Sequence, residues 1–299
     1  GMHQSALLKI AAVLKNSRKE PSSKQMIDWV LDNPGAGQYT QLGLVDAINN
    51  LVHRDGYPFE SPSYNIGWLR SINQIVSSMG AEGRRILAMP RFRNLYLWPI
   101  RMAVAGEFVP SYGDSNHLFQ SLIGWAPEIL ESAYRHSKDP VFARALRQIK
   151  ARPRRDLFVP RLDSAEVAEV AGRARGPLGV QSQLLPGVGF ASLQAGSPRN
   201  RTALALFYGY YHGHSHFDRL QLDLYSWRHA LTPDFGYPET ADSYDPRRFG
   251  FLSHTVAHNT VMIDAGRQTL SRGRLHVYDP GDFAQLVEVS SESSYPGVA

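Results

Sequence analysis

Three histidines at alternate positions are the first residues of this sequence whose types and spacing could do chemistry. They are His212, His214 and His216 in 210-YYHGHSHFDRLQLDLY-225. Imidazole nitrogens bind metal ions and transfer protons near neutral pH. Because a strand sends alternate side chains to one face, a strand continuing from Thr202 through this stretch would present all three on the same side. The stretch is therefore a candidate metal or catalytic site.

A metal ion bound here would need ligands from more than one strand, since neighbours on a single strand cannot complete a tetrahedral shell. The sequence has no cysteine, so the ligands must be His, Asp or Glu. Two further candidates are Asp234 in 231-LTPDFGY-237 and His258 in 255-TVAHNTVMID-264. With His216 they would supply two nitrogens and one oxygen and leave a fourth position open. The alternative from spacing alone is a set of hydrogen-bonded strand histidines.

The secondary structure that must position these residues changes along the chain from helices to strands. Residues before about 150 show the three-and-four spacing of helices, clearest in 63-SYNIGWLRSINQIVSSMG-80. From about residue 185 the apolar period is two, as in Leu220, Leu222 and Leu224, which is typical of half-buried strands. We expect helices over 6–14, 42–52, 63–80, 95–104, 118–130 and 141–149, and strands over 187–194, 202–211, 220–225, 255–264 and 283–290.

Helices followed by strands predict two domains, the second an antiparallel sandwich or barrel. The helical part fits a bundle, a toroid or a solenoid, and periodicity does not choose among them. An Arg-, Pro- and Gly-rich stretch over 151–180 marks the boundary.

Composition narrows the class of protein. Hydrophobic residues make up 43% of the 299 residues, enough for one large core or two ordinary ones. No apolar run approaches the roughly 20 residues that span a bilayer, and residues 1–16 lack the features of a secretory signal. The net charge of +5 favours a polyanionic partner. We interpret the basic run between Arg144 and Arg161 as a solvated helix end and linker, and expect neither nucleic-acid binding nor membrane insertion.

A more specific signal comes from three separated elements that occur in order. The blocks 213-GHSHFDRLQLDLYSWRHALTPDFGY-237 and 254-HTVAHNTVMID-264 contain a GHxHxD turn, a D-x-G and an AHNT. Together they resemble the heparinase II/III-like polysaccharide lyases, which include alginate and oligoalginate lyases. The resemblance covers about residues 40–290 and implies that this is a partial or shortened member.

The resemblance also implies the fold. We expect an α+β protein of two domains, with a helical (α/α) toroid-type N-terminal domain followed by an antiparallel β-sandwich. The helical domain is placed at residues 1–155, a linker at 156–184 and the sandwich at 185–299, with both domains partial.

Each matching position acquires an implied role from the resemblance. His214 corresponds to a catalytic histidine contributed by the sandwich domain. His216, Asp234 and His258 match residues that hold zinc in family members that have it, where the metal shapes the site, so the expected cofactor is structural zinc. Asp218 is expected to tie down the turn.

The helical half carries a second resemblance, in which 54-RDGYPFESPSYNIGWL-69 matches a loop that presents a catalytic tyrosine at a helix start. The matching residue is Tyr64; the alternative is an aromatic that only packs there.

These lyases also carry an Asn-His or similar pair on an earlier helix, of which His3 would be the remnant. In 106-GEFVPSYGDSN-116, which resembles a family loop, Asp114 is expected to cap a helix.

The chemistry implied is β-elimination at a 4-linked uronate. It needs neutralisation of the carboxylate, a base for the C5 proton and an acid for the C4 oxygen. Tyr64 is the candidate for acid, base or both, provided that its pKa falls below about 10, and His214 is the second catalytic group. Charge neutralisation would fall to the Asn-His pair, which is incomplete here.

Substrate contacts are assigned to residues around these motifs. Arg247 and Arg248 could bind a carboxylate or sulfate in bidentate fashion, or form an exposed loop pair. Tyr237, Tyr244 and Glu60 are assigned to substrate binding with them.

The expected function is therefore a lyase acting on an acidic polysaccharide or oligosaccharide. The alternatives are a catalytically inactive glycan-binding relative or fragment, and a toroid glycoside hydrolase, which would need two facing carboxylates. A periplasmic or secreted location follows from the resemblance alone. The sequence does not indicate the uronate, its sulfation, endo or exo action, or the oligomeric state.

Overall fold

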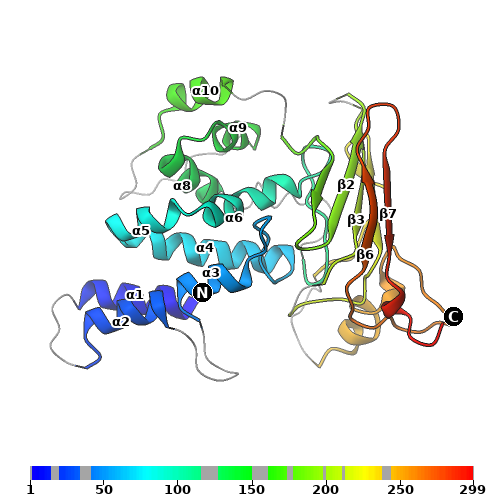
Figure 1. The fold of residues 1–299 in the computed structure, drawn as a ribbon, viewed down its shortest axis with the longest axis horizontal. Coiled ribbons are helices and arrows are strands. Elements are labelled where there is room, and N and C mark those ends of the chain that lie inside the picture. The colour runs from blue at the N-terminus through cyan, green and yellow to red at the C-terminus, as the bar shows by residue number, and fades with distance from the viewer. Residues whose placement is uncertain are drawn as a thin grey trace.

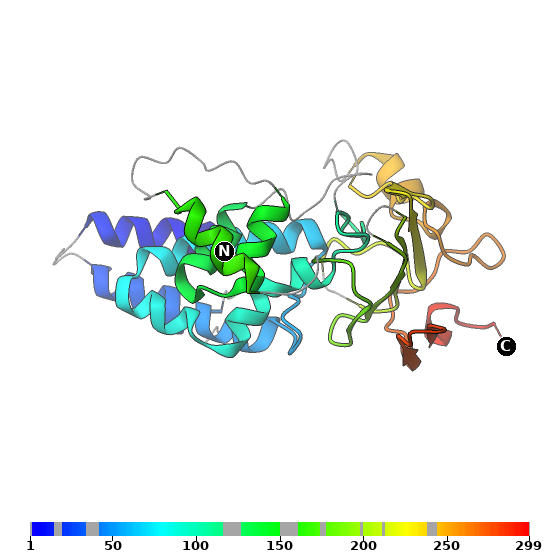
Figure 2. The same cartoon turned by 90° about the horizontal axis from the view of Figure 1, so that it is seen from above.

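The computed structural model describes residues 2–14, 20–33, 42–115, 127–149, 161–173, 178–197, 200–210, 213–237 and 244–298. Helices gather on one side of the molecule and strands on the other (Figure 1), and the view from above shows the same separation (Figure 2). The α+β class is confirmed. The described helices are α1 (Met2–Val13), α2 (Ser23–Asp32), α3 (Leu44–Leu51), α4 (Pro62–Ser78), α5 (Gly80–Leu87), α6 (Pro90–Arg101), α8 (Pro127–Ser137), α9 (Pro140–Gln148) and α10 (Ser164–Gly172).

Helix α4 runs through the helical part and positions Tyr64 in its first turn. It begins at Pro62, whose fixed φ suits the first turn of a helix, directly after the N-cap residue Ser61. α4 packs against α1, α5 and α8. Full burial of one aliphatic side chain contributes about 1.5–3 kcal/mol, and the face that α4 buries includes Ile66, Leu69, Ile72, Ile75 and Val76.

The larger sheet is an antiparallel meander in which neighbours in sequence are neighbours in space. At the centre of the β3–β4 pair, Leu204 faces Leu224 and Ala205 faces Asp223. Because side chains alternate across a sheet, the leucines lie on one face and Ala205 and Asp223 on the other. The strands are β1 (Gln183–Leu185), β2 (Phe190–Ala195), β3 (Thr202–Phe207), β4 (Gln221–Ser226) and β5 (His229–Ala230).

A second sheet pairs β6 (Arg274–Asp279) with β7 (Leu286–Ser290) in antiparallel fashion. It contacts β2 of the first sheet. The Tyr278 hydroxyl donates to the Ser192 carbonyl at 3.2 Å, and Nε2 of Gln285 donates to the Gln194 carbonyl at 3.2 Å. The two sheets are therefore joined along β2.

Aromatic contacts join the first sheet to the helical part. Tyr112 stacks on Phe207 of β3 with ring centroids 4.5 Å apart, and Phe108 stacks on Tyr225 of β4 at 5.0 Å. All four side chains are buried. Stacked aromatic pairs add about 0.5–1.5 kcal/mol beyond their burial, so the two parts share an apolar core.

The same face of the sheet buries a carboxyl group, that of Asp223, which is 2% exposed. Burial raises its pKa well above the usual value, the nearby Asp234 raises it further, and the hydrogen bond from Gln221 opposes the shift. The folded protein therefore keeps a proton that the unfolded chain releases above about pH 4. Stability must fall as the pH rises from that point toward the folded-state pKa.

Asp223→Asn is expected to remove this pH dependence. Relative to the parent, the variant should gain about 1–3 kcal/mol of unfolding free energy between pH 5 and pH 8. The Asn oxygen still accepts from Gln221, whose Nε2 lies 3.1 Å from Asp223 Oδ1. Urea unfolding at both pH values measures the difference, with exposed Glu288→Gln as the control. An equal stability difference at both pH values would contradict the assignment.

The sequence predicted most of these elements but placed some boundaries wrongly. The helices expected over 6–14, 42–52, 63–80, 95–104 and 141–149 correspond to α1, α3, α4, α6 and α9. The range expected over 118–130 overlaps the start of α8, and residues 116–126 lie outside the described part. The expected linker 156–184 contains α10, which packs on α9. The division at 1–155, 156–184 and 185–299 stays a prediction.

The strand expected over 255–264 is wrong. Residues Thr255–Ala257 form a 3-10 turn, and no described strand follows before β6. The polar side chains bond to neighbouring loops instead: Asn259 Nδ2 donates to the Thr232 carbonyl at 2.9 Å, and the Thr260 hydroxyl donates to the Arg219 carbonyl. This segment therefore crosses the end of β4 and places His258.

The strand expected over 202–211 ends at Phe207, so strand alternation does not arrange the histidines. His212 lies outside the described part of the chain, as does most of the basic run between Arg144 and Arg161. Among the described helices, none is long and apolar enough to cross a membrane.

Candidate active site

Tyr64 and His214, 150 residues apart in the sequence, lie in direct contact. Their rings stack with centroids 3.4 Å apart and an interplanar angle of 11°. The Tyr64 hydroxyl shares a hydrogen bond of 3.0 Å with the hydroxyl of Tyr237. The first turn of α4, the GHSH turn and the segment after β5 therefore meet at one point.

The GHSH turn has an unusual backbone that aims the His214 ring. Gly213 and His214 both have positive φ, at 66° and 52°, a conformation that costs a non-glycine residue free energy. His214 Nδ1 lies 2.8 Å from Oε2 of Glu60. A Cβ at Gly213 would lie 2.9 Å from the other oxygen of Glu60, so glycine leaves room for this carboxylate.

The pKa of Tyr64 differs from the one that the sequence argument required. Partial burial raises its pKa well above the usual value, the hydrogen bond to Tyr237 and the negative charge of Asp114 add to the shift, and Arg248 opposes it. The phenol is therefore protonated at neutral pH. A general acid must be protonated, so Tyr64 holds the proton that it would donate, but the raised pKa also weakens it as an acid. The sequence argument required a lowered pKa for either proton-transfer role.

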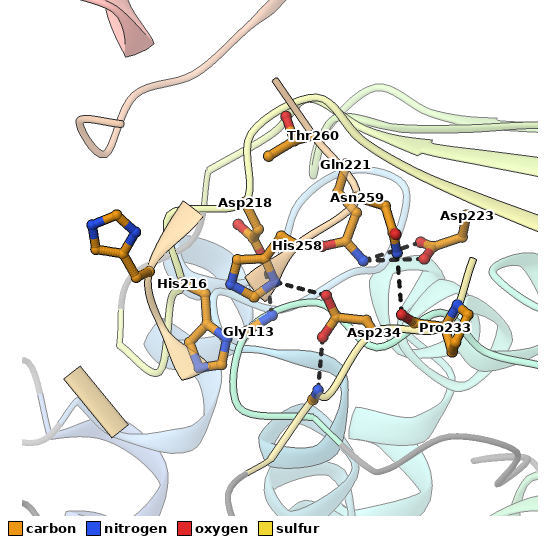
Figure 3. A network of polar contacts seen from close by, with 12 residues as sticks. Gly113, His216, Asp218, Gln221, Asp223, Pro233, Asp234, His258, Asn259 and Thr260 are labelled. Carbon is orange, nitrogen blue, oxygen red and sulfur yellow. Dashed lines mark hydrogen bonds and ion pairs between the residues drawn. The ribbon is translucent and has the colours of Figure 1, made fainter. Parts of the chain in front are cut away.

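Figure 3 shows the three residues expected to bind metal, His216, Asp234 and His258, close to one another in a network of polar contacts. His258 Nδ1 lies 2.7 Å from Asp234 Oδ2, and Asp234 Oδ1 accepts from the Gly236 amide at 2.7 Å. His216 Nε2 lies 2.9 Å from Oδ1 of Asp114. The His216 and His258 ring centroids are 5.2 Å apart. Both rings are buried.

These contacts leave one ring nitrogen on each histidine for a further partner. His216 Nδ1 and His258 Nε2 are buried and make no hydrogen bond in the structure. Two such nitrogens fit a cation that prefers imidazole ligands. Asp234 stands behind His258, in the position of a carboxylate that orients a metal-bound imidazole. Within the described ranges, no three His, Asp or Glu side chains form a ready metal-binding group.

Asp114 is a residue of this site that the sequence argument assigned to helix capping. Its Oδ1 bonds to His216 and its Oδ2 pairs with Arg248 at 2.5 Å. The backbone amide donates to the His214 carbonyl at 2.8 Å, and the carbonyl accepts from the Ser61 hydroxyl at 2.7 Å. Its partners His214, His216 and Arg248 lie about a hundred or more positions away in the sequence, so no local sequence pattern could have revealed this role.

Asp218 ties down the turn, as predicted. Its Oδ2 accepts from the Gly113 amide at 3.0 Å, and its Oδ1 pairs with Arg219 Nη1 at 2.7 Å. Neither side chain of this ion pair is exposed. The Arg219 guanidinium also lies 5.0 Å from the Phe207 ring centroid and donates to the His216 carbonyl. The pair thus fastens the GHSH turn to the sheet and to the loop that holds Asp114.

The residues assigned to substrate binding fall into two groups. Tyr237, Glu60 and Arg248 reach the site through their contacts with Tyr64, His214 and Asp114, respectively. Arg247 pairs with Asp245 at 2.8 Å and its side chain is 73% exposed, while Tyr244 is 93% exposed. Arg247 and Arg248 therefore do not act as a pair.

His3 is not brought to this site. It is exposed on α1, where the nearby Ser5 hydroxyl donates to Gln74 near the end of α4. Gln74 follows Tyr64 by ten residues, or about 15 Å of helix. Among the described residues, no hydrogen bond or ring contact joins His3 to Tyr64 or His214.

Comparisons with known proteins match part of this chain to a family. Residues 178–298 match the family described as heparinase II/III-like, C-terminal. A search of curated proteins finds no match. Similar solved structures include a heparinase III gene product, with TM-score 0.68 and 15% identity, and the heparan sulfate lyase HepC from Pedobacter heparinus, with TM-score 0.64 and 18% identity. At these identities the likeness shows the fold.

The chain spans about two fifths of the length of these solved structures. The alignments cover 98% of this chain but 42% of the heparinase III and 41% of HepC. The GHSH turn, Asp234 and His258 all lie inside the matched range. The resemblance found in the sequence is thus confirmed: residues 178–298 match the heparinase II/III-like C-terminal model, and the fold of the chain is similar to that of the heparinase structures.

Proposed function

We propose that this chain carries the catalytic pair of a polysaccharide lyase that cleaves an acidic, uronate-containing glycan by β-elimination. The observation that carries the proposal is the stack of Tyr64 on His214 at 3.4 Å, which joins the helical tyrosine motif to the GHSH motif. Both proton-transfer groups that the reaction needs then lie in one place.

The proton-transfer roles follow from the two environments. The protonated phenol of Tyr64 donates its proton to the C4 oxygen as the C4–O bond breaks. His214, whose Nδ1 faces Glu60, accepts the C5 proton at Nε2, and the electron pair of the C5–H bond forms the C4–C5 double bond. The charge of Arg248 acts on Tyr64, where it opposes the rise in pKa, and Arg248 takes part in holding the uronate carboxylate.

The hydrolase alternative is weaker in this geometry. It requires two carboxylates that face the glycosidic bond. Two carboxylates of the described site are Glu60, which bonds to His214, and Asp114, which bonds to His216 and Arg248. Both are committed to orienting other side chains.

The substrate class rests on the relatives and on charge. The similar structures are named heparinase III and heparan sulfate lyase, and the chain carries a net charge of +5, which suits a polyanion. We propose a heparan-type glycan or another uronate polymer such as alginate, encountered in the periplasm or outside the cell.

Two finer features of the architecture belong to the same proposal. The helices form part of an (α/α) toroid domain, and the two sheets form part of an antiparallel β-sandwich domain. The substrate then lies between them, as ligands often do at domain interfaces.

The test of the function is direct. The purified chain is incubated with alginate, heparin, heparan sulfate, chondroitin and hyaluronan, and the ultraviolet absorbance of the unsaturated uronate is followed. A rise on one polymer identifies a lyase and its substrate class. Binding of a polymer by folded protein without any rise would instead identify an inactive glycan-binding relative.

The proposed cofactor is structural zinc held by His216 and His258, with Asp234 as a third ligand or as the partner of His258. When bound, zinc would fix the loop of His258 against the GHSH turn and supply no proton transfer. Chelator-treated protein is expected to melt at a higher temperature when zinc is added, by an amount equivalent to about 4 kcal/mol at a thousandfold excess over Kd.

His258→Gln is the matched variant for this prediction, because it removes one of the two imidazole ligands. It should abolish most of the zinc-dependent rise in melting temperature. Magnesium, which prefers oxygen ligands, should give little rise with either protein. Equal zinc responses in the parent and the variant would count against the site.

A further inference from the structure

Glu60 makes a contact that its assignment to substrate binding does not explain. Its Oε2 lies 2.8 Å from Nδ1 of His214. We propose that Glu60 is a positioning residue that keeps the proton of neutral His214 on Nδ1 and so presents the Nε2 lone pair to the substrate. This inference rests on the proposed function, since it concerns the base of that reaction.

Glu60 is held rigidly enough to do this. Its amide donates to Oδ1 of Asn65 at 3.2 Å, and its carbonyl accepts from Asn65 Nδ2 at 2.6 Å and from the Tyr57 hydroxyl at 3.0 Å. Asn65 and Tyr57 are both 0% exposed. The carboxylate that faces His214 therefore extends from a fixed backbone.

His214 is constrained on three sides. Glu60 holds one edge of the ring, Tyr64 covers one face, and the Asp114 amide holds the His214 carbonyl at 2.8 Å. The positive φ values of Gly213 and His214 bring the ring edge to the carboxylate. Because ionised Glu60 can only accept, the nitrogen facing it must be the donor in neutral His214.

Charge argues against direct substrate binding by Glu60. The proposed substrate is a polyanion, and a carboxylate placed against a uronate or sulfate would repel it. Directed at His214, the same charge stabilises the imidazolium that forms when Nε2 accepts the C5 proton. Catalytic dyads and triads use a carboxylate behind histidine in this way.

The first arm of the test needs no substrate. Long-range proton–nitrogen NMR of ¹⁵N-histidine protein reports which ring nitrogen carries the proton, and His214→Ala assigns the signal. The parent should show neutral His214 protonated at Nδ1. Glu60→Ala should shift His214 toward the other tautomer, and Glu60→Gln, which retains an acceptor oxygen, should shift it less. An unchanged tautomer in Glu60→Ala would overturn the proposal.

The second arm uses the substrate found in the polymer panel. Glu60→Ala is expected to lower kcat by about 10²-fold or more, as loss of oriented proton transfer does, with KM within about threefold of the parent value. Glu60→Gln should recover part of kcat. Glu169→Gln, which removes an exposed carboxylate on α10, is the charge-matched control and should change neither constant.

The outcomes separate the two proposals. A rise in KM with unchanged kcat in Glu60→Gln would return Glu60 to substrate binding and overturn the positioning role. If the parent cleaves no polymer, the proposed function fails, and the NMR arm still decides whether Glu60 sets the tautomer. If Glu60→Ala does not fold, the tautomer shift and the kcat of Glu60→Gln decide, and an unchanged tautomer with unchanged kcat would overturn the proposal.

Discussion

Tyr64→Phe is expected to lower the rate of elimination by about 10²- to 10⁴-fold, the usual contribution of a positioned acid or base. The substitution removes one oxygen, whose hydrogen bond is to the Tyr237 hydroxyl at 3.0 Å, and leaves the ring stacked on His214. The variant should therefore fold and bind substrate as the parent does. Initial rates of unsaturated-uronate formation on the best polymer measure the loss.

Tyr237→Phe is the control, since it removes the partner hydroxyl and keeps the acid. The hydrogen bond to Tyr237 contributes to raising the pKa of Tyr64, so its loss lowers that pKa. A general acid works only while protonated, and the phenol stays protonated at neutral pH with or without this hydrogen bond, so Tyr237→Phe should keep most of the rate that Tyr64→Phe loses. Near-parental activity of Tyr64→Phe at neutral pH would contradict an acid role for Tyr64.

The largest expected effect on stability is that of Arg219→Met, about 3–5 kcal/mol of unfolding free energy. Arg219 and Asp218 form an ion pair with both side chains 0% exposed. Without the guanidinium, the Asp218 carboxylate is left buried with less compensation for its charge. The loss of the contact to the His216 carbonyl would also loosen the GHSH turn. Guanidinium chloride unfolding gives the free-energy difference.

The double variant Asp218→Asn with Arg219→Met shows whether the lost stability comes from an uncompensated buried charge or from lost packing. Replacing both ions removes the uncompensated charge, so the double variant should be more stable than Arg219→Met alone. A loss below about 1 kcal/mol for Arg219→Met would mean that the pair is solvated. The same would follow if the double variant were the less stable of the two.

The order of helices and strands could be predicted because the apolar residues of a buried face repeat with the period of the element that carries them. The apolar face of α4 repeats at three and four positions, and β4 alternates, so both were found within two residues of their ends. The segment 255–264 was wrongly predicted as a strand because it is rich in the β-branched residues that favour strands, such as Val256, Val261 and Ile263. Its polar side chains, Asn259 and Thr260, instead satisfy backbone groups of distant loops.

Helix α2 escaped prediction although it carries a local signal. Ser22 and Gln25 form a capping box at its start, a sequence signature of a helix N-terminus. α10 escaped because it is short and follows an Arg- and Pro-rich stretch that indicates a linker. Its N-cap Asp163 accepts from the amides of Ala165 and Glu166, which is again a local signal.

The candidate site was predictable where its residues belong to motifs. The stack of Tyr64 on His214 and the proximity of His216 to His258 follow the expected grouping. The partners that set their chemistry were not predictable, because Glu60 and Asp114 act through contacts more than a hundred residues away in the sequence. Which acid a histidine faces depends on how the two parts dock, and no period or spacing encodes that.

Asp114 has a mechanical consequence for how the helical and strand parts are held together. Its amide, its carbonyl and both carboxylate oxygens are each bonded to a different partner, in the GHSH turn, at the N-cap of α4 and in the turn of Arg248. The helical and strand parts cannot separate gradually at this point, since any widening breaks several of these bonds together. The two parts are therefore fastened to each other at this single residue, and their spacing there is set by four bonds that act together.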